Sequence, residues 1–143
     1  MRVDNALRTH SIPEAHPQDM ASWFAHLQLE PSLDAGRDAR VWAAPVLLEH
    51  GCGAVADDAL VVLTELVVNG ARHGVGILDV ELSAPSAHDL RIAVSDAGTG
   101  VVARREPDQA GGRGLHIVAA IAERWGVDHD SHGKVVWAVL RLI

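Results

Sequence analysis

Cysteine and aromatic side chains are scarce in this sequence of 143 residues. It has one cysteine, Cys52, no tyrosine, one phenylalanine and four tryptophans. A single cysteine cannot form a disulfide within the chain, which is typical of proteins from a reducing compartment. We therefore expect an intracellular, cytoplasmic protein, in which Cys52 is a small apolar residue between two glycines rather than a reactive thiol.

Positive charge is scarce too. Lys134 is the only lysine, and 12 Lys and Arg residues against 19 Asp and Glu residues give a net charge of -7. A nucleic-acid partner is not indicated, because phosphate contacts require a basic surface. No apolar run approaches the length of a membrane-spanning helix, and the first residues lack the apolar segment of an export signal. We therefore expect no direct nucleic-acid partner and no membrane partner.

The nine histidines do not form a recognisable metal motif. His129 and His132 have a loop-like spacing, no cysteine lies near them, and no His-x-x-x-His pair occurs. Zinc sites in proteins are built from such groups. We expect both histidines to face solvent.

The composition predicts one globular domain. Apolar residues make up 48% of the chain and charged residues 22%, and the length is sufficient for a hydrophobic core. Residues 1–21 are polar and without period, which indicates a flexible N-terminal arm before a domain at residues 22–143.

Periodicity predicts the elements of that domain. Alternating apolar and polar residues indicate strands at 23–29, 77–83, 90–95, 127–130 and 135–142. Helical spacing indicates helices at 33–50, with Leu33 on the apolar side, at 57–74, and from 115 to near Trp125. Pro45 predicts a kink, or two shorter helices, near residues 41–45. The short connections predict an α+β, two-layer α/β sandwich, in which three helices cover one face of a mixed, mostly antiparallel sheet of about five strands.

Two polar residues interrupt the apolar pattern of the second helix. Glu65 and Asn69 stand four residues apart, so both project from one helix face with Cβ atoms about 5–6 Å apart. The carboxylate can accept a proton, and the amide oxygen can ligate a hard cation. The alternative is that both side chains simply face solvent, and the pair alone does not decide between these interpretations.

Two glycine-containing segments follow along the chain. Residues 96–100, Asp-Ala-Gly-Thr-Gly, come at a strand end and combine a hydrogen-bond acceptor with backbone that a ligand can approach closely. Residues 111–114, Gly-Gly-Arg-Gly, lead into the third helix, whose free N–H groups and dipole favour an anion. A flexible connector is the alternative for the second segment. Neither segment matches a Walker motif or a dinucleotide fingerprint.

The order of these three motifs closely resembles the N, G1 and G2 boxes of the GHKL ATPases, the superfamily of gyrase-type, Hsp90-type and histidine-kinase ATP-binding domains. The resemblance covers about residues 23–142 and implies the Bergerat ATP-binding fold. Within the superfamily, the chain looks most like the anti-sigma factor serine/threonine kinases of actinobacteria. The segments that carry this closer likeness are residues 65–74, 111–115, 124–127 and 133–137.

The resemblance implies ATP and Mg as cofactors and suggests roles for the matching residues. Glu65 would act as general base toward the attacking hydroxyl, Asn69 would ligate the Mg ion, and Asp96 would accept the adenine amino group. Gly98 and Gly100 would let the base and ribose approach, and Gly112 and Gly114 would act as hinges of a lid over the phosphates. Further expected nucleotide contacts are Arg72, His73, Arg113 and Leu115. For Arg72 and His73 a surface role fits equally well.

The resemblance also implies a function. Members of this group phosphorylate a serine on an anti-anti-sigma (STAS-type) partner, bind a sigma factor, regulate transcription and are often homodimers. The alternative is an ATP-binding regulator that holds a sigma factor or its antagonist without phosphoryl transfer. One position departs from the family pattern, since Val135 follows Gly-Lys where a threonine is common. The resemblance implies that a water-mediated contact to adenine is lost there.

Overall fold

The computed structural model describes residues 22–98 and 112–142, with the side chains of residues 112–114 left undescribed. The arm expected at residues 1–21 therefore lies outside the described residues. Within them the chain forms five strands, three α-helices and one short 3-10 helix. In chain order they are β1 (Trp23–Leu29), α1 (Ala35–Glu49), η2 (Gly53–Val55), α2 (Ala56–His73), β2 (Leu78–Ser86), β3 (Asp89–Asp96), α3 (Gly112–Ile121), β4 (Arg124–Asp130) and β5 (Gly133–Arg141).

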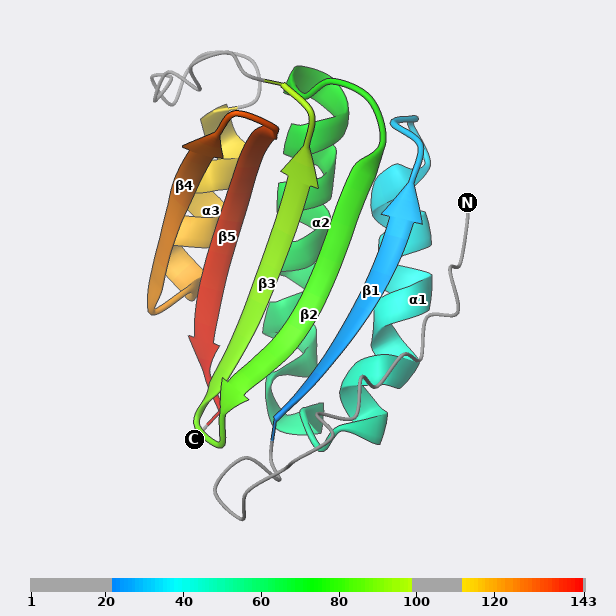
Figure 1. Ribbon diagram of the computed structural model, residues 1–143. Coiled ribbons are helices and arrows are strands. Elements are labelled where there is room, and N and C mark those ends of the chain that lie inside the picture. Colours follow the sequence, from blue (N-terminus) through cyan, green and yellow to red (C-terminus); the bar gives the residue numbers. More distant parts are fainter. Residues whose placement is uncertain (1–21, 99–111, 143) are drawn as a thin grey trace.

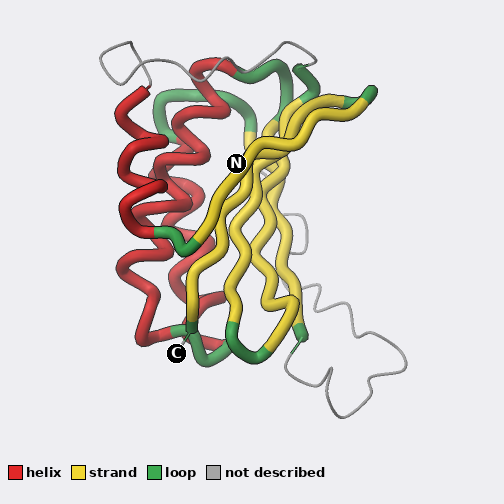
Figure 2. Tube along the Cα trace, turned by 90° about the vertical axis from the view of Figure 1, so that its left-hand side faces the viewer, coloured by secondary structure: helices red, strands yellow, loops and turns green. Residues whose placement is uncertain are grey.

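The strands form one sheet in the order β1-β2-β3-β5-β4, and the three helices cover one of its faces (Figures 1 and 2). This confirms the expected two-layer α+β sandwich. All four neighbouring strand pairs of this sheet are antiparallel, so the expected mixed sheet is wrong. The reason is the connection through α3, which returns the chain to the end of the sheet where β3 began. The hairpin of β4 and β5 then places β5 beside β3 in the opposite direction.

Helix α2 is the central helix of the covering layer (Figure 1). Its inner side carries Val62, Leu63, Leu66 and Val67, each with an exposed fraction of 0%. Full burial of one such side chain is worth about 1.5–3 kcal/mol, so this stripe fastens the helix to the sheet. The helix has acidic residues in its first turn and basic residues in its last, which suits its dipole.

Helix α1 is one continuous helix from Ala35 to Glu49, so of the two expected alternatives near residues 41–45 the pair of shorter helices is wrong. Pro45 lies inside the helix on its exposed side, where the carbonyl group left without an N–H partner can face water. Leu33 lies before the helix and is fully exposed instead of joining the apolar stripe. The third helix ends at Ile121, earlier than expected, because Arg124 already begins β4.

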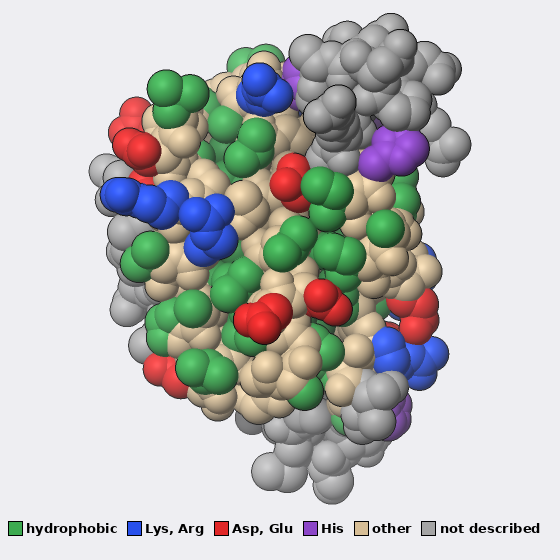
Figure 3. Space-filling model, turned by 180° about the vertical axis from the view of Figure 1, so that it is seen from behind, with side chains coloured by type: hydrophobic (Ala, Val, Ile, Leu, Met, Phe, Trp, Pro, Cys, Tyr) green, Lys and Arg blue, Asp and Glu red, His purple; other side chains and the backbone are tan. Residues whose placement is uncertain are grey.

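The outer surface of the helical layer is mixed in character. Figure 3 shows this face, with hydrophobic side chains set among acidic and basic ones. The large apolar side chains exposed on α1 and α2 are Val41, Leu48, Val61 and Val68. Within the described part of the chain, no helix has the combination of length and apolar character needed to cross a membrane.

Candidate functional site

Three of the motifs found in the sequence meet at one end of the domain. Helix α2 ends there, β3 ends there, and α3 and β5 begin there (Figure 1). The antiparallel order explains this arrangement, because β3 runs toward this end and β5 runs away from it. The end of α2 at His73 and the start of β5 at Gly133, which are 60 residues apart in sequence, thus lie at one edge of the fold.

Asp96 is the most highly bonded side chain at this edge. Its Oδ1 atom accepts a hydrogen bond from the backbone N–H of Gly98, at 2.7 Å, and a longer one from that of Val75, at 3.2 Å. Its Oδ2 atom lies 3.0 Å from Nζ of Lys134. Asp96 is therefore held rigidly at the end of β3, because each of its oxygen atoms has a partner in a different segment.

Lys134 is a site residue that the sequence motifs missed. It is the direct cross-strand neighbour of Asp96, and the side chains of Lys134 and Asp96 are only 4% and 2% exposed. Strand alternation explains its inward position, because Val136 and Ala138 on the same side of β5 belong to the core. The signal in the sequence was a lone lysine at the start of a strand whose alternate residues are apolar.

Val135 does not face Asp96. It pairs with Ser95, one position earlier on β3, so its side chain lies on the opposite, helix-free face of the sheet. The departure from the family pattern therefore concerns a residue on the wrong face to contact a base held by Asp96. The side chain that lies beside Asp96 in β5 is Lys134.

Three glycines allow the chain to close around Asp96. A Cβ atom added to Gly74 would lie 2.7 Å from Asp96 Oδ2, and one added to Gly98 would lie 2.8 Å from Oδ1. A Cβ atom on Gly133, whose φ is 151°, would overlap the backbone carbonyl of Asp96. Real Cβ atoms do not approach so closely. Gly74 and Gly133 were not among the expected site residues, because each is required by a contact with a segment distant in sequence.

Asn69 and Glu65 lie one turn apart on α2. Asn69 is only 7% exposed. No hydrogen bond or ion pair joins the side chain of Asn69 or Glu65 to another described residue. The amide group of Asn69 is therefore available to a ligand that approaches this face of α2. Glu65 is half-buried and therefore accessible to a ligand.

The other expected contacts are placed as follows. Arg72 and His73 are exposed in the last turn of α2, and Leu115 is half-buried in α3. The backbone of residues 112–114 forms the first turn of α3. Gly100 lies outside the described residues. The structure thus brings Asp96 and Gly98 together at the end of α2. Of the glycine-rich segment, only the helical backbone of residues 112–114 is described.

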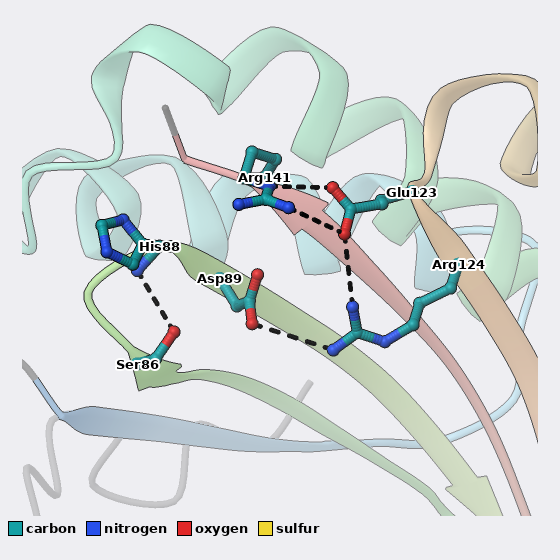
Figure 4. A network of polar contacts seen from close by, with 6 residues as sticks. All are labelled: Ser86, His88, Asp89, Glu123, Arg124 and Arg141. Carbon is teal, nitrogen blue, oxygen red and sulfur yellow. Dashed lines mark hydrogen bonds and ion pairs between the residues drawn. The ribbon is translucent and has the colours of Figure 1, made fainter.

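A second polar cluster lies at the other end of β3 (Figure 4). Arg141 donates hydrogen bonds to Glu123 from Nε, at 2.9 Å, and from Nη2, and Arg124 links Glu123 to Asp89. The hydrogen bond from Arg141 holds the pKa of Glu123 below its usual range.

Cys52 is buried and does not belong to this cluster. Burial raises the pKa of the Cys52 thiol, in agreement with the expected small apolar role.

Comparisons with known proteins identify the family. The family profile described as histidine kinase-like ATPase domain matches residues 29–140. None of the curated proteins compared with the chain matches it. The crystal structure of the RsbU and RsbW domains of Rv1364c from Mycobacterium tuberculosis is similar with a TM-score of 0.59 and 20% identity, over 82% of this chain and 32% of that one. The histidine kinase domain from the blue-light activated histidine kinase of Erythrobacter litoralis EL346 gives a TM-score of 0.48 at 20% identity, over 76% of this chain and 61% of that one.

The present chain covers 32% of the chain in the Mycobacterium tuberculosis structure, and the likeness to it concerns the fold. The family profile, by contrast, runs through all of the elements that meet at Asp96, from the end of β1 to near the end of β5. The chain therefore belongs to the histidine kinase-like ATPase domain family.

Proposed function

We propose that this protein is an ATP-dependent serine/threonine kinase of the anti-sigma factor type. It binds ATP with Mg, phosphorylates a serine of a STAS-type anti-anti-sigma partner in the cytoplasm, and holds a sigma factor in the absence of that partner. Its family supports the ATP-binding part. The observation that carries the kinase part is the pair on α2, a buried Asn69 without a partner in the described chain and an accessible Glu65 one turn away.

In this proposal each residue has a separate task. Asp96, fixed by two backbone N–H groups, accepts a hydrogen bond from the amino group of adenine. Asn69 offers its amide oxygen to Mg, which neutralises charge on the triphosphate when bound. Gly98 keeps the backbone close to Asp96 and leaves room for the base. Arg72, His73 and the first turn of α3 provide positive groups and N–H groups for the phosphates.

Glu65 acts as the general base. It accepts the proton of the partner's serine hydroxyl while the serine oxygen bonds to the γ-phosphorus atom. The bond between that phosphorus and the bridging oxygen breaks, and ADP leaves with the electron pair. The position of Glu65 suits this task. Glu65 and Asn69 are four residues apart on one helix face, so the base and the metal ligand would both lie near the same end of the triphosphate.

The test combines nucleotide binding with phosphoryl transfer. The protein is incubated with Mg and γ-labelled ATP in the presence of STAS-domain partners, and label on the partner is measured for the wild type and for Glu65→Gln. We expect transfer to fall by about 10²–10⁴-fold in the variant, while ATP affinity changes little. Glu30→Gln is the matched control, because Glu30 is exposed between β1 and α1, and it should transfer phosphate normally.

Different failures have different meanings. Unchanged transfer by Glu65→Gln excludes Glu65 as the base. If the wild type binds ATP but transfers no phosphate to any partner, the result supports the alternative function, an ATP-binding regulator that acts without phosphoryl transfer. Asn69→Ala should weaken Mg-dependent ATP binding. If Mg raises the ATP affinity of the variant as much as it raises that of the wild type, Asn69 is excluded as the metal ligand.

A further inference from the structure

The ion pair between Asp96 and Lys134 is more deeply buried than a structural role explains. Both side chains are nearly inaccessible, and Nζ lies 3.0 Å from Oδ2. Removing two charges from water costs several kcal/mol per ion before their attraction is counted, so a buried pair is often no better for stability than apolar side chains of similar size. Apolar residues fill the neighbouring inward positions of β3 and β5, namely Val94 and Val136. A recognition role accounts for charge at this position better than packing does.

The hydrogen-bonding capacity of the pair is only partly used. Oδ1 of Asp96 already accepts two backbone N–H groups, whereas Oδ2 has the ammonium group as its partner. A carboxylate oxygen can accept two hydrogen bonds, and an ammonium group has three to donate. In the part of the chain that the structure describes, Lys134 has no polar partner besides Asp96. Oδ2 can therefore accept one further hydrogen bond, and Nζ, which lies 3.0 Å from it, can still donate.

An acceptor beside a donor matches one edge of adenine. The side-chain amides of Asn and Gln read adenine in the same way, because their oxygen accepts from the amino group while their nitrogen donates to the adjacent ring nitrogen. Guanine presents two acceptors, O6 and N7, at the corresponding edge. Its O6 atom would face the carboxylate of Asp96, which has no proton to donate.

We propose that Lys134 is a base-selecting residue of this ATPase domain. It donates a hydrogen bond from Nζ to the ring nitrogen next to the adenine amino group, while Asp96 accepts from the amino group through Oδ2. The inference rests on the proposed function, because it requires a nucleotide base at Asp96. It adds a direct protein donor to a position where the family resemblance implied a water-mediated contact.

The experiment removes the ring nitrogen from the ligand instead of removing a residue from the protein. Affinities of the wild-type protein are measured by calorimetry for ATP and for two analogues, 1-deaza-ATP and 7-deaza-ATP, in which a C–H group replaces N1 or N7. We expect one analogue to bind about 10- to 100-fold more weakly than ATP, as for a lost hydrogen bond to a charged group. The analogue that loses affinity identifies the nitrogen that Lys134 contacts.

A variant then assigns the lost contact to Lys134. Lys134→Met removes the ammonium group and keeps a side chain of similar length. We expect it to bind ATP about as weakly as the wild type binds the sensitive analogue, and to show no further loss with that analogue. Arg37→Met is the matched control, because Arg37 is an exposed cation on α1, and it should discriminate between ATP and the analogue as the wild type does. Thermal unfolding of each variant identifies any loss of folded protein.

The outcomes separate this inference from the function on which it rests. If the wild type binds ATP and both analogues equally well, Lys134 does not contact the base, and ATP binding itself stands. If Lys134→Met is folded and still discriminates against the sensitive analogue, another group makes the contact, and the inference is overturned. If the wild type binds no adenine nucleotide at all, both proposals fail together. The wild-type comparison is decisive even if the variant does not fold.

Discussion

Gly74 and Asp96 lie in contact where the end of α2 meets the end of β3. A Cβ atom on Gly74 would come within 2.7 Å of both Cγ and Oδ2 of Asp96, and within 2.6 Å of the carbonyl oxygen of Gly70. The absence of a side chain at one residue therefore sets the position of a carboxylate that is 22 residues away in sequence.

Replacement of Gly74 by alanine should both destabilise the fold and weaken ATP binding. The added methyl group must displace either the α2 backbone or Asp96, and overpacking of this kind costs about 1–3 kcal/mol. Urea unfolding and ATP titration measure the two effects. Gly53→Ala is the control, because the nearest atom to its Cβ would be Leu48 Cδ2 at an ordinary 3.4 Å. A Gly74→Ala protein with wild-type stability and affinity would show that the contact is not needed.

The inner stripe of α2 should dominate the stability of the domain. Leu66 is 0% exposed in the middle of the helix, so Leu66→Ala should lower the free energy of unfolding by about 2–5 kcal/mol. Val61 lies on the same helix but is 42% exposed, and Val61→Ala should cost less than about 1 kcal/mol. The comparison is made by chemical unfolding of both variants. Similar losses in the two would contradict the placement of the core on this side of α2.

Pro45→Ala should raise stability. Proline inside a helix removes one hydrogen bond and costs up to about 3 kcal/mol, part of which is offset by the lower entropy of the unfolded chain. Because Pro45 is exposed, alanine restores the bond without leaving a cavity, and we expect a gain of about 1–2 kcal/mol. Pro31→Ala is the control, because Pro31 lies outside the helices. This change restores no helical hydrogen bond and only raises the entropy of the unfolded chain, so the stability should stay the same or fall slightly. A loss of stability in Pro45→Ala would contradict this account.

The cluster around Glu123 should make stability sensitive to acid. The hydrogen bond from Arg141 lowers the pKa of Glu123 in the folded protein below its ordinary value of 4.5. Its contribution to stability is therefore present above that value and is lost as the pH falls through the lower, folded pKa. Between about pH 7 and about pH 3, the wild type should lose more stability than Glu123→Gln does. The effect is small, because the cluster is exposed and screened by solvent.

Urea midpoints measured across this pH range test the effect. Glu30→Gln serves as the control, because Glu30 is exposed and has no bonded partner among the described residues. It should follow the acid dependence of the wild type. Identical acid profiles for wild type and Glu123→Gln would show that the ion pair with Arg141 does not persist in solution.

The parts of the fold that depend on local pattern were predictable from the sequence. The period-two alternation of β1, β3 and β5 and the apolar stripe of α2 correspond closely to the observed elements. The errors arose where tertiary structure overrides local preference. Pro45 is tolerated within a continuous helix because it faces solvent, and the direction of β5 relative to β3 depends on the crossover through α3.

The surroundings of Asp96 were only partly predictable, for a related reason. The motif predicted Asp96 and Gly98, which are close together in sequence, and the structure joins them by a hydrogen bond. Lys134, Gly74 and Gly133 approach Asp96 from other segments, and their roles depend on which residue of β5 stands opposite Asp96. The periodicity within each strand does not specify this pairing, because β3 and β5 are separated in sequence by a helix and another strand.

The place of β5 in the sheet also bears on the order in which the protein can be made. It lies between β3 and β4, yet both are synthesised before it. A nascent chain that has not yet released β5 from the ribosome therefore has β3 as an unpaired edge, and its Asp96 is without the cation of Lys134. The last strand to emerge joins the two parts of the sheet and completes the charge balance at Asp96 in the same step. The charge of Asp96 is thus balanced only after the last strand of the sheet has paired with β3.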